Sequence, residues 1–291
     1  LKNNFYIRII KTNGIKTGPG NARNLGVDKA KGKYIGFLDA DDEWLEDKLQ
    51  QSIDVITSQN RVFVAHNGWV FENDRRTYND IASHYVKWQR NIYHGLYRRG
   101  FVSTSSVVAR LDAIVAVGMF DEELTVGQDF DLWLKLANWS NSNFEIFDKA
   151  LTYYHVQPSG ITRNTERRLR HCLFIAIRHA PELRRHPGRP ILSLWFRVLA
   201  VYFEASQAYR AKGENTAAVI TVLKVPAELL LITVLFLYGD IVKKTAPVRF
   251  MPNYPPVVIP LPVIWVFSVF VIYLYDLFPL MPAIFRALKL Q

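Results

Sequence analysis

One short segment of the chain constrains its fold more than any other. Residues 34–38 form a brief apolar run, Tyr-Ile-Gly-Phe-Leu, and Asp39-Ala40-Asp41-Asp42 follows it directly. An apolar run of this length is typical of a strand that is buried on both faces of a sheet. In open α/β sheets, ligands bind beyond the carboxyl ends of the strands. The segment therefore predicts an α/β fold with a polar site at the end of this strand.

The acidic cluster itself has two interpretations. Neighbouring carboxylates repel one another unless a cation or a hydrogen-bond donor compensates, and Mg²⁺ or Mn²⁺ commonly bridges carboxylates to phosphates. Asp39, Asp41 and Asp42 are therefore predicted to hold Mg²⁺ or Mn²⁺ on a diphosphate. The alternative is an acidic turn in which Asp42 caps the next helix, and both interpretations can hold together.

The first 160 residues alternate strand and helix signals, as in an α/β fold. Asn21 is expected to cap the first helix and Gly32 to end it. The segment 72–100 carries few periodic signals and is expected to be irregular. We expect strands at 5–10, 34–38, 61–65, 105–109 and 151–156, and helices at 22–31, 45–56, 111–117 and 130–137.

Two further segments carry polar chemistry. In the segment 18–24, which runs from a loop into the first helix, Arg23 could offer a planar charged fork to a phosphate, although taken alone an ordinary tight turn before a helix explains this segment better. Asp129 follows Gly127-Gln128 at an expected helix start, where it is either a general base or a helix cap. Asp131 is either a second member of that site or an acid that complements the helix dipole.

Taken together and in this order, three segments resemble glycosyltransferase family 2, which has the GT-A fold. The resemblance covers roughly residues 5–165. The segments are Gly-Asn-Ala-Arg-Asn at 20–24, Ala-Lys-Gly-Lys-Tyr-Ile-Gly-Phe-Leu-Asp-Ala-Asp-Asp-Glu-Trp at 30–44, and Gly-Gln-Asp-Phe-Asp-Leu-Trp-Leu at 127–134.

The resemblance implies a Rossmann-like sheet that binds a nucleotide-diphosphate sugar donor. It places Asp39 and Asp41 on a divalent metal at the diphosphate, with Asp42 beside them, and it places Arg23 near the nucleotide. Gly20 and Asn24 of the same loop, together with Asp39, complete the implied donor contacts.

The resemblance also implies the reaction. Asp129 would be the catalytic base, which deprotonates an acceptor hydroxyl for inverting attack on the anomeric carbon. Gln128 stands where the family often has Glu. The family's fold begins with a strand, a helix and a second strand that have no counterpart here, which predicts an N-terminally truncated chain with compromised nucleotide binding.

Charge and hydropathy divide the rest of the chain. The net charge is +10, and eight arginines fall between residues 163 and 189. Basic residues beside apolar segments fit a membrane surface better than a nucleic-acid groove, although a solvated helix face is the alternative. Residues 256–275 are twenty residues without a charge, long enough for a bilayer, whereas the run 229–238 is too short. A buried hairpin or a re-entrant segment would also explain the longer run.

The predicted organisation is therefore a GT-A domain at 1–165, a helical appendage at 166–225 and a hydrophobic membrane-associated segment at 226–291. The leading hypothesis is a glycosyltransferase at the cytoplasmic face of the cell membrane. It would build a surface polysaccharide or a lipid-linked glycan, and no nucleic acid would be a partner. The alternatives are a polyprenyl-phosphate sugar synthase and a non-catalytic membrane protein that retains the fold.

Overall fold

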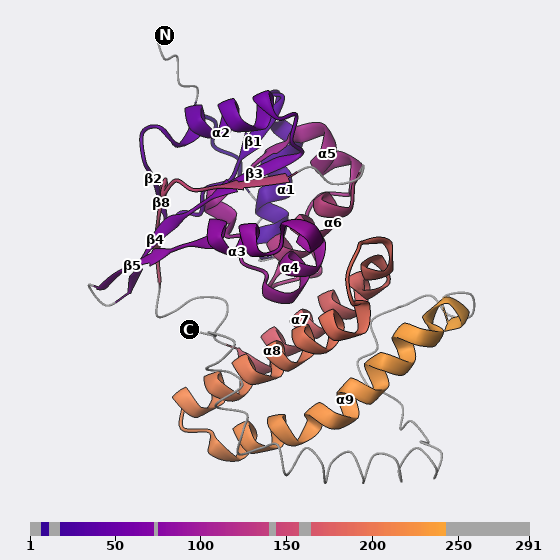
Figure 1. Ribbon diagram of the computed structural model, residues 1–291. Coiled ribbons are helices and arrows are strands. Elements are labelled where there is room, and N and C mark those ends of the chain that lie inside the picture. Colours follow the sequence, from indigo (N-terminus) through magenta and orange to yellow (C-terminus); the bar gives the residue numbers. More distant parts are fainter. Residues whose placement is uncertain (1–6, 12–17, 73–74, 140–143, 157–163, 243–291) are drawn as a thin grey trace. The chain divides into compact units, whose positions relative to one another are not determined.

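A computed structural model describes residues 7–11, 18–72, 75–139, 144–156 and 164–242 of the chain (Figure 1). Its residues fall into two compact units, Leu1–Val225 and Pro226–Gln291. The first unit combines mixed β-sheets with helices, which confirms the predicted α/β class.

The elements of the first unit follow one another in an order that starts with a helix. They are α1 (Pro19–Lys29), β1 (Tyr34–Gly36), β2 (Glu43–Trp44), α2 (Lys48–Ser58), β3 (Phe63–His66), β4 (Gly68–Glu72), β5 (Arg75–Asn79), α3 (Ile81–Lys87), η1 (Gln89–Asn91), α4 (Ile92–Arg99), η2 (Thr104–Ser106), β6 (Val108–Arg110), α5 (Leu111–Ala116), α6 (Gln128–Asn138), β7 (Phe144–Phe147), β8 (Thr152–His155), α7 (Thr165–His179), η5 (Ala180–Arg185) and α8 (Pro190–Ala211).

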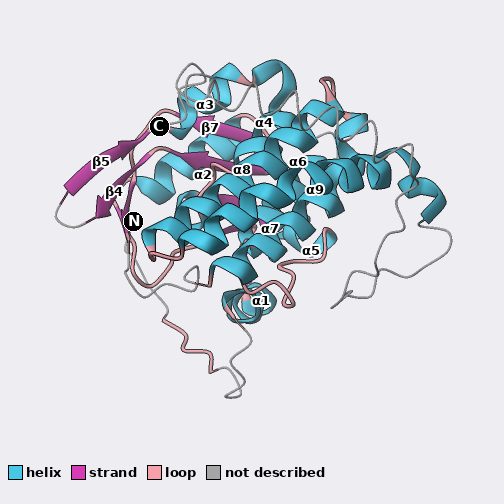
Figure 2. Ribbon diagram, turned by 90° about the horizontal axis from the view of Figure 1, so that it is seen from below, coloured by secondary structure: helices cyan, strands magenta, loops and turns pink. Residues whose placement is uncertain are grey.

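The strands form two four-stranded sheets. The first has the order β1-β6-β3-β7, in which β6 runs antiparallel to both β1 and β3, while β3 and β7 are parallel. The second has the order β2-β8-β4-β5, in which β8 and β4 are parallel. The β4–β5 hairpin forms one edge of this second sheet (Figures 1 and 2).

Helices cover both faces of the first sheet. Successive side chains of β3 point to opposite faces, and each face contacts a different helix. On one face, Val64 of β3 packs with Ile56 of α2 and with Val108. On the other face, the Phe63 ring lies 5.9 Å from the ring of Trp133 on α6. The sheet therefore lies between α2 and α6.

Two long helices, α7 and α8, lie side by side in both views (Figures 1 and 2). They are attached to the α/β part by buried polar contacts. His94 of α4 lies 2.6 Å from the hydroxyl of Ser193 on α8, and the Tyr97 hydroxyl donates to the carbonyl of Ala176 on α7 at 2.7 Å. The helical segment is therefore packed into the first unit.

Several predicted elements differ in the structure. Residues 7–11 form no strand, and the side chains of Ile7 and Ile9 are exposed. The segment 72–100, expected to be irregular, holds a hairpin strand and two helices. Its strand β5 is polar and exposed on both faces, so it shows no alternation in the sequence. The strand expected at 105–109 begins at Val108 because Thr104–Ser106 form a 3-10 turn, and β7 was not predicted at all.

The last described helix, α9 (Asn215–Val242), begins after a turn at Gly213, whose φ of +77° suits glycine. Within the described residues, one helical stretch, Asn215–Leu237, is long and apolar enough to cross a membrane by length and composition. The sequence-based estimate of this apolar stretch as residues 229–238 was therefore too short, and the run 256–275 lies outside the described residues.

Candidate functional site

The acidic cluster lies just beyond the carboxyl end of β1, as predicted. The backbone N–H of Asp42 donates to the carbonyl of Asp39 at 3.0 Å, which closes a tight turn. Within this turn Asp39 is half-buried, Asp41 is exposed and Asp42 is buried. The three carboxylates therefore lie in different environments.

Asp42 is the member that the fold holds in place. Its Oδ2 accepts a hydrogen bond from the Ser105 hydroxyl at 2.5 Å, and its Oδ1 accepts one from the backbone N–H of His155 at 3.2 Å. Burial raises the pKa of Asp42 above its ordinary value despite these hydrogen bonds, and the charges of Asp39 and Asp41 raise it further. The helix-cap alternative for Asp42 is wrong, since α2 begins only at Lys48 and follows Asp47.

The turn η2 brings the predicted base to the acidic cluster. The hydroxyl of Thr104 donates to Oδ2 of Asp129 at 3.0 Å. The next residue, Ser105, binds Asp42 and also accepts the backbone N–H of Asp39 on its hydroxyl at 3.1 Å. Two adjacent hydroxyls therefore join Asp129 to the cluster. The cap of α6 is Gly127, so the helix-cap alternative for Asp129 is wrong too.

Tyr154 of β8 marks where these carboxylates converge. Its pKa is raised first by burial and then by the negative charges of four carboxylates, those of Asp42, Asp41, Asp39 and Asp129. A charge acts on a neighbouring titration only over a short range in water. All four carboxylates are therefore near enough to Tyr154 to raise the pKa of its hydroxyl.

Arg23 reaches the same place from α1. Its Nη2 lies 2.5 Å from Oδ1 of Asp39, and its guanidinium carbon lies 5.4 Å from the centre of the Phe120 ring. The Nη1 atom is buried and has no hydrogen-bond partner within the described residues. Helix α1 begins at Pro19 after Gly18, so Asn21 is not the cap that the sequence predicted.

Gly20 and Asn24 are packed against the chain. A Cβ at Gly20 would lie 3.3 Å from the carbonyl oxygen of Asp121. The Asn24 amide donates to the Phe120 carbonyl and to Glu122, both at 2.9 Å, so its two hydrogens are used within the protein. The structure thus gives both residues a part in holding α1 against residues 120–122.

Asp131 has a structural role and is not a second member of the site with Asp129. Its side chain is fully buried, with Nζ of Lys135 at 2.7 Å, Nη1 of Arg178 at 3.1 Å and Nε2 of His179 at 2.8 Å. Burial opposes ionisation of Asp131, but the His179 hydrogen bond and the Lys135 charge outweigh it, so its pKa lies well below the ordinary value. Asp131 therefore ties α6 to α7.

The carboxylates offer the chemistry of a divalent-cation site, although within the described residues no group of three His, Cys, Asp or Glu side chains is arranged to hold a metal. Both oxygens of Asp42 are occupied by hydrogen bonds. Oδ2 of Asp39 and the exposed carboxylate of Asp41 accept no hydrogen bond from the described part of the chain. Two carboxylates suffice for a cation that is shared with substrate phosphates.

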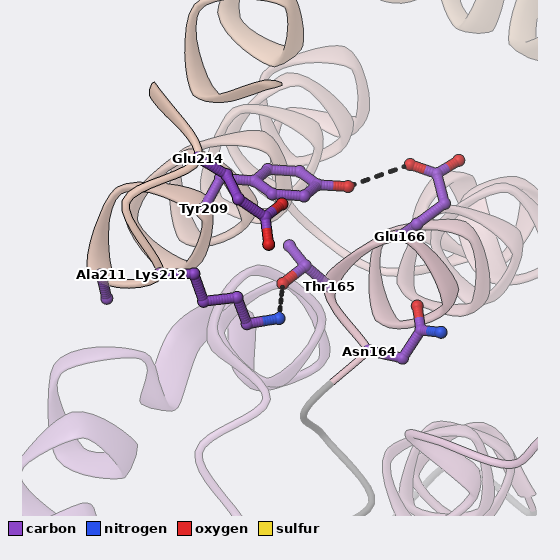
Figure 3. Close-up of a pocket in the computed structure, with 7 residues that line it drawn as sticks. All are labelled: Asn164, Thr165, Glu166, Tyr209, Ala211, Lys212 and Glu214. Carbon is purple, nitrogen blue, oxygen red and sulfur yellow. Dashed lines mark hydrogen bonds between the residues drawn. The ribbon is translucent and has the colours of Figure 1, made fainter. Parts of the chain in front are cut away.

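A separate hollow of about 890 Å³ opens where the start of α7 meets the end of α8 (Figure 3). Lys212 Nζ donates to the Thr165 hydroxyl at 2.8 Å, and the Tyr209 hydroxyl donates to Glu166 at 3.3 Å. None of the predicted site residues lines it. The lining residues are Asn164, Thr165, Glu166, Tyr209, Ala211, Lys212 and Glu214.

Sequence reasoning missed Thr104 and Ser105, which connect the site. Their signal was a run of four hydroxyl residues, Ser103 to Ser106, directly before a strand. A buried hydroxyl requires a partner, but the sequence did not tell which carboxylate each one would reach. The fold and the site together define the class of protein. It is an α/β protein in which several carboxylates lie close together beyond the end of strand β1.

Residues 2–113 match the family model described as glycosyl transferase family 2. The chain is 30% identical over 190 residues to the amylovoran biosynthesis glycosyltransferase AmsB of Erwinia amylovora. This alignment covers 64% of the chain and 61% of AmsB. It is 27% identical over 159 residues to WfgD of Escherichia coli, a UDP-Glc:alpha-D-GlcNAc-diphosphoundecaprenol beta-1,3-glucosyltransferase. This second alignment covers 55% of the chain and 60% of WfgD.

The chain thus spans less than two thirds of the length of either relative. Among solved structures, it is similar to residues 1–349 of S. aureus TarS in complex with UDP-GlcNAc. That match has a TM-score of 0.47 and 13% identity, and it covers 81% of this chain and 75% of the other.

Proposed function

We propose that the protein is an inverting glycosyltransferase that moves a sugar from a nucleotide-diphosphate donor to a hydroxyl of a glycan or lipid-linked acceptor. The observation that carries the proposal is the pair of hydroxyls in η2, which places Asp129 beside the Asp39–Asp42 cluster. A base beside a cluster suited to a diphosphate is the arrangement that glycosyl transfer with inversion needs.

In the proposed mechanism, a carboxylate oxygen of Asp129 accepts the proton of the acceptor hydroxyl. The hydroxyl oxygen forms the new bond to the anomeric carbon of the donor while the bond from that carbon to the diphosphate oxygen breaks. The electron pair of the broken bond leaves with the nucleotide diphosphate. Attack from the side opposite the leaving group inverts the anomeric configuration.

Asp39 and Asp41 would hold Mg²⁺ or Mn²⁺, with Asp42 as the fixed support of the turn. A bound cation would stabilise the negative charge that develops on the departing diphosphate. Arg23 complements this part of the site, since its buried Nη1 lacks a partner within the described residues and suits a phosphate oxygen. We assign Gly20 and Asn24 to supporting the position of Arg23 rather than to direct contact.

We further propose that the acceptor is presented at a membrane, with the transferase at the cytoplasmic face. WfgD is named for a diphosphoundecaprenol-linked acceptor and AmsB for amylovoran biosynthesis. The apolar stretch Asn215–Leu237 offers an attachment of suitable length. In this proposal residues 1–165 transfer the sugar, 166–225 form a helical appendage and 226–291 attach to the membrane.

The test is an assay of membranes that contain the 291-residue chain, with a panel of UDP- and GDP-sugars, Mn²⁺ and diphosphoundecaprenol-linked GlcNAc as acceptor. Mass spectrometry of the extracted lipid would detect the added hexose, and NMR would give its anomeric configuration. We expect Asp129→Asn to leave only a small residual rate of transfer while donor binding remains. A product with retained configuration, or full activity of Asp129→Asn, would contradict the mechanism.

A further inference from the structure

The turn η2 contains a buried hydroxyl that the proposed reaction does not yet use. We propose that Thr104 is a positioning residue for the base: its hydroxyl fixes the carboxylate of Asp129 in the orientation from which it accepts the acceptor proton. This inference rests on the proposed function, because it assigns Thr104 a part only if Asp129 is the base.

The hydrogen bonds of Asp129 support this assignment. Oδ2 accepts the Thr104 hydroxyl at 3.0 Å, and Oδ1 accepts the backbone N–H of Phe130 at 2.8 Å. One donor on each oxygen fixes the plane of the carboxylate and leaves further lone pairs for an incoming proton. Without Thr104, the carboxylate would keep one bond to its own helix and could rotate about it.

Thr104 can serve as a fixed point because its turn is itself held on several sides. The indole N–H of Trp44 donates to the Ser105 carbonyl at 2.7 Å, and the buried ammonium of Lys48 donates to the Val107 carbonyl at 3.3 Å. The same ammonium lies 3.9 Å from the centre of the Trp44 ring. Thr104 is 5% exposed, so solvent does not compete for its hydroxyl.

The neighbouring hydroxyl, that of Ser105, binds different groups. The effects of Thr104 and Ser105 can therefore be separated by experiment. Ser105 binds Asp42 and the backbone of Asp39, on the side of the predicted diphosphate cluster. Thr104 therefore affects proton transfer, whereas Ser105 affects the donor. A misplacement of about 1 Å can cost about 100-fold in rate, so loss of the Thr104 bond should lower kcat and leave the donor KM nearly unchanged.

The same turn offers a matched control. Ser106 is also buried, but its hydroxyl donates to the Ser103 carbonyl at 2.8 Å and touches no carboxylate. Ser106→Ala therefore removes one buried hydroxyl from the turn, as Thr104→Val does, without changing the bonds of Asp129. Thr104→Ser restores the hydroxyl with a smaller side chain.

The experiment measures kcat and donor KM of the full chain in membranes, together with thermal stability, for these three variants. Thr104→Val should lower kcat by about 10- to 100-fold with donor KM within about twofold. Thr104→Ser should return kcat to within about threefold of wild type, and Ser106→Ala should keep it within about twofold. If Thr104→Val fails to fold, Thr104→Ala takes its place under the same criteria.

A second comparison separates the inference from the proposed function. In an Asp129→Asn background, Thr104→Val should cause no further loss of the residual rate, because the two residues act as a unit. Wild-type kcat in Thr104→Val, no recovery in Thr104→Ser, or an equal loss in Ser106→Ala would overturn the inference. Full activity of Asp129→Asn would instead overturn the proposed function itself.

Discussion

The buried carboxylate of Asp131 makes a quantitative prediction about stability. Its side chain is 0% exposed, while the basic side chains around it are 7% exposed for His179, 22% for Lys135 and 31% for Arg178. Asp131→Asn keeps the volume but removes the charge, and it turns an amide toward these donors. We expect this variant to fold with lower stability because Lys135 and Arg178 lose their anion.

The magnitude follows from the burial of the group. Removal of one partner from a buried ion pair costs about 3–5 kcal/mol. Since Lys135 and Arg178 are partly exposed and can regain water, we expect the lower end, about 3 kcal/mol. For a domain of this size that loss corresponds to a fall of about 6–12 °C in the melting temperature.

The assay is urea unfolding of wild type and Asp131→Asn, followed by circular dichroism. Arg170→Gln is the matched control on α7, because its ion pair with Glu166 is exposed, at 70% and 49%, and should contribute less than about 0.5 kcal/mol. The pKa of Asp131 is lowered in the folded state. Its stabilisation is therefore present above the unfolded pKa of about 3.9 and is lost as the pH falls through the lower folded value.

The difference between the two proteins should accordingly shrink below about pH 4. A loss under about 1 kcal/mol in Asp131→Asn would refute the reasoning. A loss of equal size in Arg170→Gln would refute it as well, since burial would then not be the cause.

Three further predictions concern other parts of the first unit. Burial lowers the pKa of Lys48 to about 7, so stability should rise from pH 7 toward pH 10 by up to about 1.4 kcal/mol per pH unit, and Lys48→Met should flatten this rise in thermal melts. Gly127→Ala should cost about 1–3 kcal/mol in urea unfolding, because φ is +77° and the new Cβ would lie 2.9 Å from Ile175. Asp41→Asn should raise the Mn²⁺ concentration for half-maximal transfer at least about tenfold, and an unchanged requirement would remove Asp41 from the cation site.

The sequence predicted those parts of the site that depend on local pattern. The strand at 34–36 and the acidic turn after it were predicted from the order of neighbouring residues alone, and α2 follows from the spacing of Leu49, Ile53 and Ile56. The bounds of α1 were less certain, because Gly18 and Pro19 start the helix earlier than Asn21 would.

The contacts between elements were beyond the sequence. The partners of Thr104 and Ser105 depend on how β6 pairs with β1, and that register places Val108 opposite Gly36. Asp131 is a second residue whose partners could not be predicted from the sequence. Its position near the proposed base suggested a catalytic part, but the approach of α7, which begins 34 residues later at Thr165, gives it Arg178 and His179 as partners instead.

The hydrogen bonds around Asp42 also determine how the chain can be divided. Ser105 lies 63 residues after Asp42 in the sequence, and His155 lies 113 residues after it. Closing such long loops is slow and requires most of the sheet to be in place. No fragment that separates these residues, or Arg23 from Asp39, holds the complete site, so split or permuted versions of the protein should keep residues 23–155 intact and move their breakpoints elsewhere.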